Sequence, residues 1–288
     1  MLWRGGRQSG NIEDRRGISL GGGRLAGGGI GAVIIALIAL YFGVDPSVIL
    51  DGGQPAPGVD SGPVDSGSSA PPSGQDEARE FVAVVLADTE DAWGDIFRNA
   101  GRSYDPPVLV LFTGAVQSAC GMAESAVGPF YCPRDRKVYL DLDFFRELSQ
   151  RFRAPGEFAA AYVVAHEVGH HVQSLLGIGQ QVSRQGAGAG QAERNALSVR
   201  QELQADCFAG IWANHADRTK HILEQGDVEA ALDAASAIGD DRLQRQAQGY
   251  VVPESFTHGS SAQRVRWFKR GLEGGRVADC DTFAATSL

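Results

Sequence analysis

Apolar residues recur every three or four positions between residues 76 and 98, which predicts an amphipathic helix. Its apolar side chains are Phe81, Val84, Val85, Ala92, Trp93, Ile96 and Phe97. From Phe144 onward the same spacing predicts a mostly helical chain, with helices at about 143–152, 156–176, 191–217, 219–224, 227–238, 240–248 and 260–273. The glycine-rich stretch 177–190 predicts a loop between two of these helices, either a lid or a simple connector.

Two shorter segments carry a β pattern. Residues 108–112 form an apolar run, and residues 137–142 alternate as a half-buried strand does. The segment between them, around Gly128-Pro129 and Cys132-Pro133, is dense in turn residues. These patterns predict an α+β fold, predominantly α, with a small β-sheet.

Residues 25–44 contain no charged side chain. Twenty helical residues span about 30 Å, the thickness of the hydrocarbon core of a bilayer, so the run predicts one transmembrane helix. Five arginines precede it in residues 1–24, and the positive-inside rule assigns that segment to the cytoplasm. The alternative is a cleaved signal peptide, but its apolar region is usually shorter and no clear cleavage site follows here.

Residues 45–75 are rich in Pro, Gly, Ser and Asp, and they predict a flexible linker. Residues 76–288 then form the folded domain, in accord with a 288-residue chain of 43% hydrophobic content. The expected location is the cytoplasmic membrane, crossed once, with the domain in the periplasm or outside the cell. The sequence leaves the oligomeric state open.

The charge balance excludes nucleic acid as a partner. The chain carries a net charge of −9. Five arginines against Glu13 and Asp14 give residues 1–24 a charge of +3, so the remainder sums to −12. Nucleic acid requires a basic face, which an acidic body does not offer.

Four cysteines, Cys120, Cys132, Cys207 and Cys280, all follow the predicted span. Outside the cytoplasm disulfides persist, and four cysteines allow three pairings. Cys120 and Cys132 are close in sequence and flank a Gly-Pro loop, which favours 120–132 and, by elimination, 207–280. Buried free thiols are the alternative; a cysteine zinc site is disfavoured because no Cys-x-x-Cys spacing occurs.

The segment His166-Glu167-Val168-Gly169-His170 lies within the helix predicted at 156–176. Histidines four residues apart lie on one face of a helix, so both imidazoles can bind one metal ion while Glu167 faces its open side. This arrangement is typical of a zinc hydrolase, although the motif alone also arises by chance.

A catalytic zinc normally has three protein ligands, so a third is required. A histidine ligand in the extended motif needs Gly at 173 and His at 176, but Gln173 and Leu176 stand there. His171 points about 100° away from His170 around the helix, which favours a packing or supporting role.

Glu202 and Asp206 lie four residues apart in the helix predicted at 191–217. We predict Glu202 as the third ligand and Asp206 as the hydrogen-bond partner of a ligand histidine. The alternative is a solvated acidic pair. Apolar neighbours on the same helix favour the ligand, because a carboxylate facing a core requires a cation; they are Ala205, Cys207, Phe208, Ile211 and Trp212.

The His-Glu-x-x-His motif followed by Glu202-Leu203-Gln204-Ala205-Asp206 resembles the gluzincin peptidases, whose third zinc ligand is a glutamate in a Glu-x-x-Ala-Asp helix. Further segments are similar to the bacterial predicted neutral zinc metallopeptidase family over nearly the whole chain apart from the linker; these are Trp3–Arg7, Glu13–Gly17, Val127–Pro133 and Thr257–Ser261 before Arg264. The resemblance implies a zincin-like domain that binds one Zn²⁺ ion. It supports the fold and the metal site better than any substrate.

The expected activity is peptide hydrolysis, with His166, His170 and Glu202 as zinc ligands and Glu167 as general base. His258 is a candidate catalytic donor for the oxyanion, and Arg264 is expected to orient a ligand carboxylate or the substrate. Helix capping and surface ion pairs are the alternatives for both. Residues 138–142 are the candidate edge strand for a bound polypeptide, with an ordinary structural strand as the alternative.

Two other functions remain open at this point. The domain is either a peptidase, a non-catalytic zinc-binding scaffold of the cell envelope, or a zinc hydrolase of a non-peptide substrate. Glu167 favours an enzyme, since a closed structural zinc site has no need of a base beside it.

Overall fold

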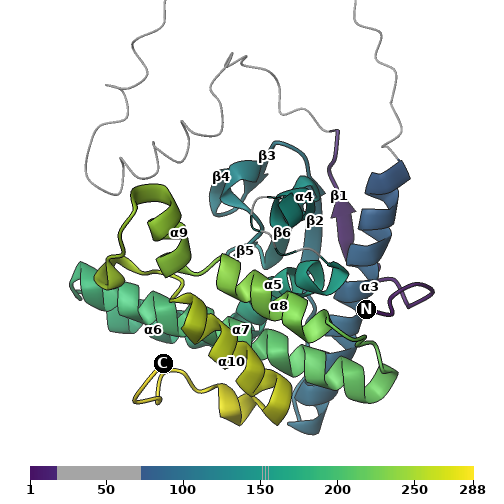
Figure 1. The fold of residues 1–288 in the computed structure, drawn as a ribbon. Helices are drawn as coiled ribbons and strands as arrows, with labels where there is room; N and C mark the ends of the chain where they lie inside the picture. The colour runs from purple at the N-terminus through teal and green to yellow at the C-terminus, as the bar shows by residue number, and fades with distance from the viewer. Residues whose placement is uncertain (18–72, 151, 153, 155) are drawn as a thin grey trace, which may run out of the picture. The chain divides into compact units, whose positions relative to one another are not determined.

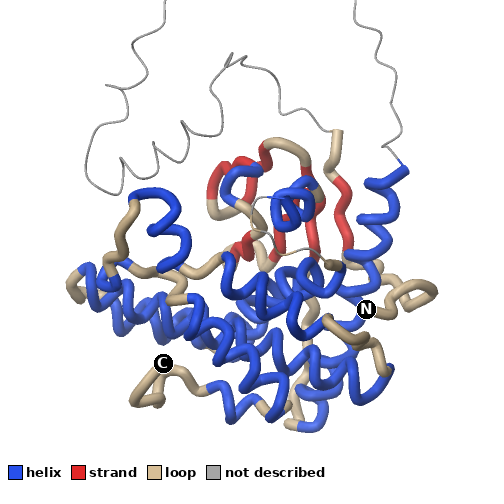
Figure 2. Tube along the Cα trace, in the orientation of Figure 1, coloured by secondary structure: helices blue, strands red, loops and turns tan. Residues whose placement is uncertain are grey.

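The computed structural model describes residues 1–17, 73–150, 152, 154 and 156–288. These residues form a mostly helical α+β unit with two small sheets, which confirms the predicted fold class (Figures 1 and 2). The predicted transmembrane helix at 25–44 and nearly all of the predicted linker lie outside the described residues. Within the described part of the chain, no helix combines the length and the apolar character needed to cross a bilayer.

The larger sheet has the strand order β1-β2-β6-β5. β1 (Ile12–Asp14) and β6 (Lys137–Asp141) both pair in parallel with β2 (Val108–Phe112), while β5 (Phe130–Cys132) pairs antiparallel with β6. β3 (Ala115–Ser118) and β4 (Gly121–Glu124) form a separate hairpin, followed by the 3-10 turn η1 (Ser125–Val127). The prediction of an edge strand at 138–142 was wrong, because β6 is an inner strand; β1 and β5 are the two edges of this sheet.

Alternation along β2 and β6 divides the apolar side chains between two cores, as the two-residue repeat of a strand requires. One face of the sheet contributes to the main core with the helices, and the other face packs under the β3–β4 hairpin. The first set is Leu109, Leu111, Val138 and Leu140, and the second is Val110, Phe112 and Tyr139.

The helices agree with the predicted ranges to within a few residues, apart from two regions. They are α3 (Ser73–Asn99), α4 (Asp143–Gln150), α5 (Glu157–Leu176), α6 (Ile178–Gly186), α7 (Gln191–Lys220), α8 (Asp227–Ala237), α9 (Asp240–Gln248) and α10 (Ser261–Gly274), with the 3-10 turns η2 (Pro253–Ser255) and η3 (Val277–Cys280).

The first difference is α6, which occupies much of the predicted loop 177–190. Gly177 has φ 77° and ends α5, but the residues after it are adequate helix formers and start a new helix at once. The second difference is that no separate helix covers 219–224, because α7 continues to Lys220 and ends at His221, which has φ 52°.

α5 lies at the centre of the fold, with 15 of its 20 residues buried. It packs against α7 and α8, and α7 packs in turn against α10. Glycines permit these close approaches. A Cβ atom on Gly169 would lie 3.0 Å from the carbonyl oxygen of Ala205 in α7, and one on Gly271 would lie 1.9 Å from that of Cys207.

Residues 1–17 belong to the same compact unit as the helices. β1 completes the sheet, the indole of Trp3 is buried against Phe81 with ring centroids 5.4 Å apart, and Arg7 forms ion pairs with Glu90 and Asp91 of α3. This packing is incompatible with the expected cytoplasmic placement of the N-terminal segment, because a single span would put β1 and β2 on opposite sides of the membrane.

Disulfides join Cys120 to Cys132 and Cys207 to Cys280, which is the pairing favoured from the sequence. The first bridge links the tip of the β3–β4 hairpin to β5. The second links α7, directly after Asp206, to η3 near the C-terminus.

Candidate metal centre

α5 and α7 bring His166, His170 and Glu202 together. The Nε2 atom of His166 lies 3.2 Å from one carboxylate oxygen of Glu202, and the Nε2 atom of His170 lies 3.3 Å from the other. One ligand atom from each residue lies within 4.8 Å of the others. Two imidazoles and one carboxylate thus converge on one point, which the one-turn spacing on α5 and the close α5–α7 contact at Gly169 make possible.

Asp206, which is fully buried, holds His166 from behind. Its Oδ1 lies 2.8 Å from Nδ1 of His166, so the imidazole donates Nδ1–H there and directs Nε2 toward Glu202. Arg264 of α10 binds both oxygens of Asp206 at 2.9 Å, and the hydroxyl of Tyr162 donates to Oδ1. Asp206 therefore accepts hydrogen bonds from three side chains, that of Arg264 on α10 and those of Tyr162 and His166 on α5.

Charged neighbours strongly shift the pKa values of Asp206, His166 and Glu202. Burial alone would raise the pKa of Asp206, but Arg264 and His166 outweigh it and lower that pKa to about 2. Burial lowers the pKa of His166, but Asp206 outweighs burial and raises it to about 10. For Glu202, burial is likewise outweighed by His170 and His166, so its pKa falls well below the usual range.

Glu167 is 8% exposed and lies beside the two histidines on α5. Burial raises its pKa, while the nearby His170 and His166 act in the opposite direction. A carboxylate whose pKa is raised toward neutrality is a stronger proton acceptor than an exposed one, which suits a general base.

His171 faces away from this centre, as expected from its position on α5. Its Nε2 donates to the backbone oxygen of Asp105 at 2.6 Å, and its Nδ1 lies 3.2 Å from the hydroxyl of Tyr131 on β5. Burial lowers the pKa of His171, which favours the neutral ring that these contacts need. The residue fixes the edge strand β5 against the helix that carries the predicted ligands.

The loop that carries His258 rests on α7. Gly259 has φ 89°, and a Cβ atom there would lie 3.2 Å from Leu203, the neighbour of Glu202. Asp240, at the start of α9, accepts hydrogen bonds from the backbone N–H groups of residues 257 to 259, and its Oδ1 lies 3.3 Å from Nδ1 of His258.

Half of the His258 side chain remains exposed. Burial lowers its pKa, but Asp240 and Glu202 outweigh burial and raise it. The carboxylate of Glu202, a predicted ligand, is thus one of the charges that favour the protonated form of His258.

Arg264 therefore orients a carboxylate, as one of the sequence interpretations held, but that carboxylate is Asp206 and not a predicted ligand. Three residues that support the site were not predicted from the sequence: Tyr162, Asp240 and Gln173, whose Oε1 lies 3.0 Å from Nδ1 of His170. Tyr162 lies one helical turn before His166, and this spacing was a usable signal. Asp240 had none, because its contact with His258 depends on how two distant segments pack.

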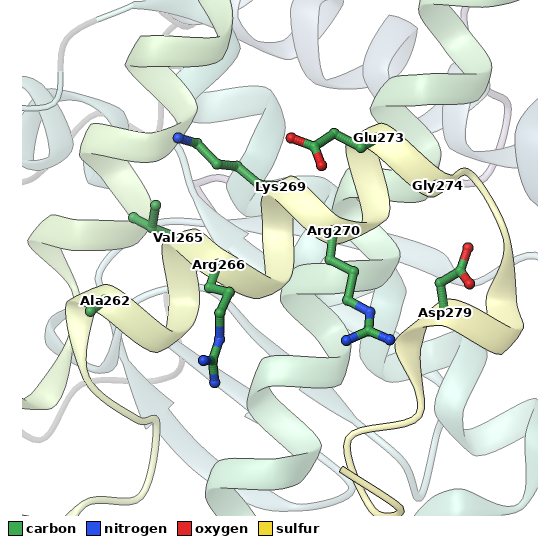
Figure 3. Close-up of a pocket in the computed structure, with 8 residues that line it drawn as sticks. All are labelled: Ala262, Val265, Arg266, Lys269, Arg270, Glu273, Gly274 and Asp279. Carbon is green, nitrogen blue, oxygen red and sulfur yellow. The ribbon is translucent and has the colours of Figure 1, made fainter. Parts of the chain in front are cut away.

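A surface hollow lies along α10 and is lined by residues of this helix and by Asp279 (Figure 3). Arg266, Lys269 and Arg270 project from the helix there, with Glu273 and Asp279 nearby. None of these side chains belongs to the candidate metal centre, so the hollow has no part in its chemistry.

The fold and the candidate metal centre define a class of protein. It is a mostly helical α+β protein in which a His-Glu-x-x-His helix and a glutamate from a second helix form one candidate metal site. The chain belongs to the family described as "Putative neutral zinc metallopeptidase", whose model matches residues 1–283.

Relatives cover nearly all of this chain. It is 49% identical to the Escherichia coli protein named "Uncharacterized protein YpfJ", over 98% of this chain and 99% of that protein. An uncharacterized protein of Mycobacterium tuberculosis is 42% identical over 87% of this chain and 86% of its own length. No solved structure matches the chain significantly.

Proposed function

We propose that the protein is a zinc-dependent endopeptidase. The convergence of His166, His170 and Glu202 beside the buried Glu167 carries this proposal. The family description supports the same metal and the same class of reaction.

The donor set fits zinc. Zinc accepts imidazole nitrogen and carboxylate oxygen, and catalytic sites typically have three protein ligands with the fourth position open. Bound there, zinc would supply Lewis acidity, which activates water and polarises a carbonyl group. Asp206 holds His166 in the tautomer that leaves its Nε2 lone pair free for the ion.

Glu167 acts as the general base in this proposal. It accepts a proton from the attacking water and delivers it to the leaving amine of the peptide. His258, held by Asp240, donates a hydrogen bond to the oxyanion that forms at the carbonyl. The edge strand β5, held against α5 by His171, is the proposed position at which an extended polypeptide adds as a further strand.

We further propose that the domain works outside the cytoplasm, where its two disulfides are stable. The uncharged run 25–44 keeps the cytoplasmic membrane as a proposed partner. The packing of residues 1–17 against α3 and β2 favours placing these residues on the same side of the membrane as the domain.

The decisive experiment compares Glu167→Gln and Glu202→Ala with the wild-type full-length chain. We expect Glu167→Gln to retain zinc and lose cleavage of unfolded proteins and peptide libraries, because the ligands remain while the base is removed. Glu202→Ala should lose most of its zinc. Glu193→Ala, an exposed substitution on the same helix, is the control and should change neither.

Cleavage by Glu167→Gln at the wild-type rate would refute the mechanism, and full zinc occupancy in Glu202→Ala would refute the choice of third ligand. Full zinc with no cleavage by the wild type would instead support the alternative, a non-catalytic zinc-binding scaffold of the cell envelope.

A further inference from the structure

The second predicted ligand, His170, is supported by a neutral side chain. The Oε1 atom of Gln173, one turn further along α5, lies 3.0 Å from Nδ1 of His170. Gln173 is fully buried. This differs from His166, whose Nδ1 faces the charged carboxylate of Asp206.

The orientation of the Gln173 amide is determined by its other contacts. Its Nε2 donates to the backbone oxygen of Gln201 at 2.7 Å and to Oε1 of Gln204 at 3.1 Å. A backbone carbonyl only accepts hydrogen bonds, so the nitrogen of the amide must face Gln201. The oxygen of Gln173 is then left to face His170.

Gln204 is fixed in the same way. It is 6% exposed, and its Nε2 donates to the backbone oxygen of Cys280 at 3.0 Å. Because that oxygen also only accepts, Oε1 of Gln204 must face Gln173. Cys280 itself is held by its disulfide to Cys207 on α7.

We propose that this chain of two amides sets the tautomer and direction of the His170 imidazole. Because Oε1 of Gln173 can only accept, Nδ1 of His170 must carry the hydrogen, and Nε2 keeps its lone pair for a metal ion. Gln173 is a positioning residue in direct contact with the ligand, and Gln204 acts through Gln173. The inference rests on the proposed zinc site.

Neutral amides suit this position because the centre already contains three carboxylates, the buried Glu167 and Asp206 and the partly buried Glu202. A fourth carboxylate behind His170 would add a buried negative charge at a high desolvation cost. Amides orient the ring without that charge, and both hydrogens of the Gln173 amide nitrogen are used.

The test measures zinc affinity of the full-length chain by competition with a chelator, for Gln173→Leu, Gln204→Leu and the double variant. We expect Gln173→Leu to bind zinc about 10- to 100-fold more weakly, the usual effect of losing such a support. Gln204→Leu should also weaken binding, although it touches no ligand. The double variant should bind zinc no more weakly than Gln173→Leu, because both substitutions interrupt the same series of hydrogen bonds.

Two measurements separate positioning from general damage. The unfolding midpoint of each metal-free variant shows whether it is folded, and the visible spectrum of bound Co²⁺ reports the geometry of the ligands. We expect altered Co²⁺ bands in Gln173→Leu and Gln204→Leu. The control Gln181→Leu, at an exposed position on α6, should keep the wild-type spectrum and affinity.

Wild-type zinc affinity in folded Gln173→Leu would overturn the inference, and so would effects of the two substitutions that simply add. A wild-type chain that binds zinc but cleaves no peptide would refute the peptidase proposal alone. A wild-type chain with no zinc affinity would overturn both.

Discussion

At the scale of single residues, Asp206 is the group on which the candidate site depends most. It is fully buried and accepts hydrogen bonds from His166, Tyr162 and Arg264. The side chain of Arg264 is only 3% exposed, so water cannot take the place of either partner if the other is removed. A buried carboxylate without its cation is strongly destabilising.

We therefore expect Arg264→Gln to lower the free energy of unfolding by about 3–5 kcal/mol, the usual cost of removing one partner of a buried pair. Urea denaturation of the metal-free protein measures this change. Arg266→Gln, an exposed substitution on the same helix, should alter the unfolding free energy by less than about 0.5 kcal/mol. Equal stabilities of the two variants would contradict the importance of the pair.

We expect His258 to determine how kcat depends on pH on the alkaline side. Its pKa is raised above 6.5, mainly by Asp240 and Glu202 acting against burial, so the imidazole remains protonated above the pH at which a free histidine loses its proton. If the charged ring is the oxyanion donor, kcat should fall on the alkaline side as pH rises through this raised pKa.

Asp240→Asn should move that decline to lower pH, because the amide removes the negative charge but still accepts the loop N–H groups. The measurement is the pH profile of kcat for this variant and for Asp233→Asn, an exposed control on α8. A decline at the same pH in all three proteins would show that His258 is not the group responsible.

At the scale of elements, the site depends on close contacts among α5, α7 and α10. Gly169 lets α5 approach Ala205 of α7, and Gly271 lets α10 approach Cys207 of the same helix. These contacts bring residues from three helices to one point. Their cost is conformational, since glycine weakens a helix interior.

Gly271→Ala should lower the free energy of unfolding by about 3 kcal/mol, because its Cβ atom would lie 1.9 Å from the carbonyl oxygen of Cys207 and the helices must separate. Gly94→Ala is the matched control in α3, where the nearest atom to an added Cβ is 3.9 Å away. There we expect a gain of up to about 1 kcal/mol from helix propensity. Thermal and urea unfolding measure both changes, and a gain of stability in both variants would show that Gly271 has no special packing role.

The elements were predictable where a period is long and regular. The helix with the metal motif and the strands at 108–112 and 137–142 follow from side-chain spacing alone. The strands β1, β3, β4 and β5 have three or four residues each, too few to show a period. α6 was missed because glycines at both ends of its segment were interpreted as a loop.

At the scale of the whole molecule, residues 1–17 are an integral part of the described unit. Four of the five arginines that suggested a cytoplasmic segment have partners within that unit, and the fifth, Arg24, lies outside the described residues. Arg4 pairs with Glu77, Arg7 with Glu90 and Asp91, Arg15 with Glu13, and Arg16 with Asp14. Charges that serve as ion-pair partners in a folded unit are weak evidence for membrane topology.

We accordingly expect the N-terminus and the C-terminus to lie on the same side of the membrane. With an epitope tag at either end, protease added to bacterial spheroplasts should remove both tags, while a cytoplasmic marker protein survives. The physical reason is that β1 and β2 cannot pair through a bilayer. Protection of the N-terminal tag alone would show that the membrane-bound protein lacks the β1–β2 pairing.

The sequence by itself determined the helical register of His166, Glu167 and His170 and the chemical type of the candidate ligands, because helix geometry is local and fixes which residues share a face. Only the tertiary structure decided that Arg264 serves Asp206, that Gln204 of α7 orients the amide of Gln173, and that β1 lies beside β2. These contacts join segments up to about a hundred residues apart. Burial and hydrogen-bond satisfaction select such contacts during packing, and no local pattern in the chain encodes them.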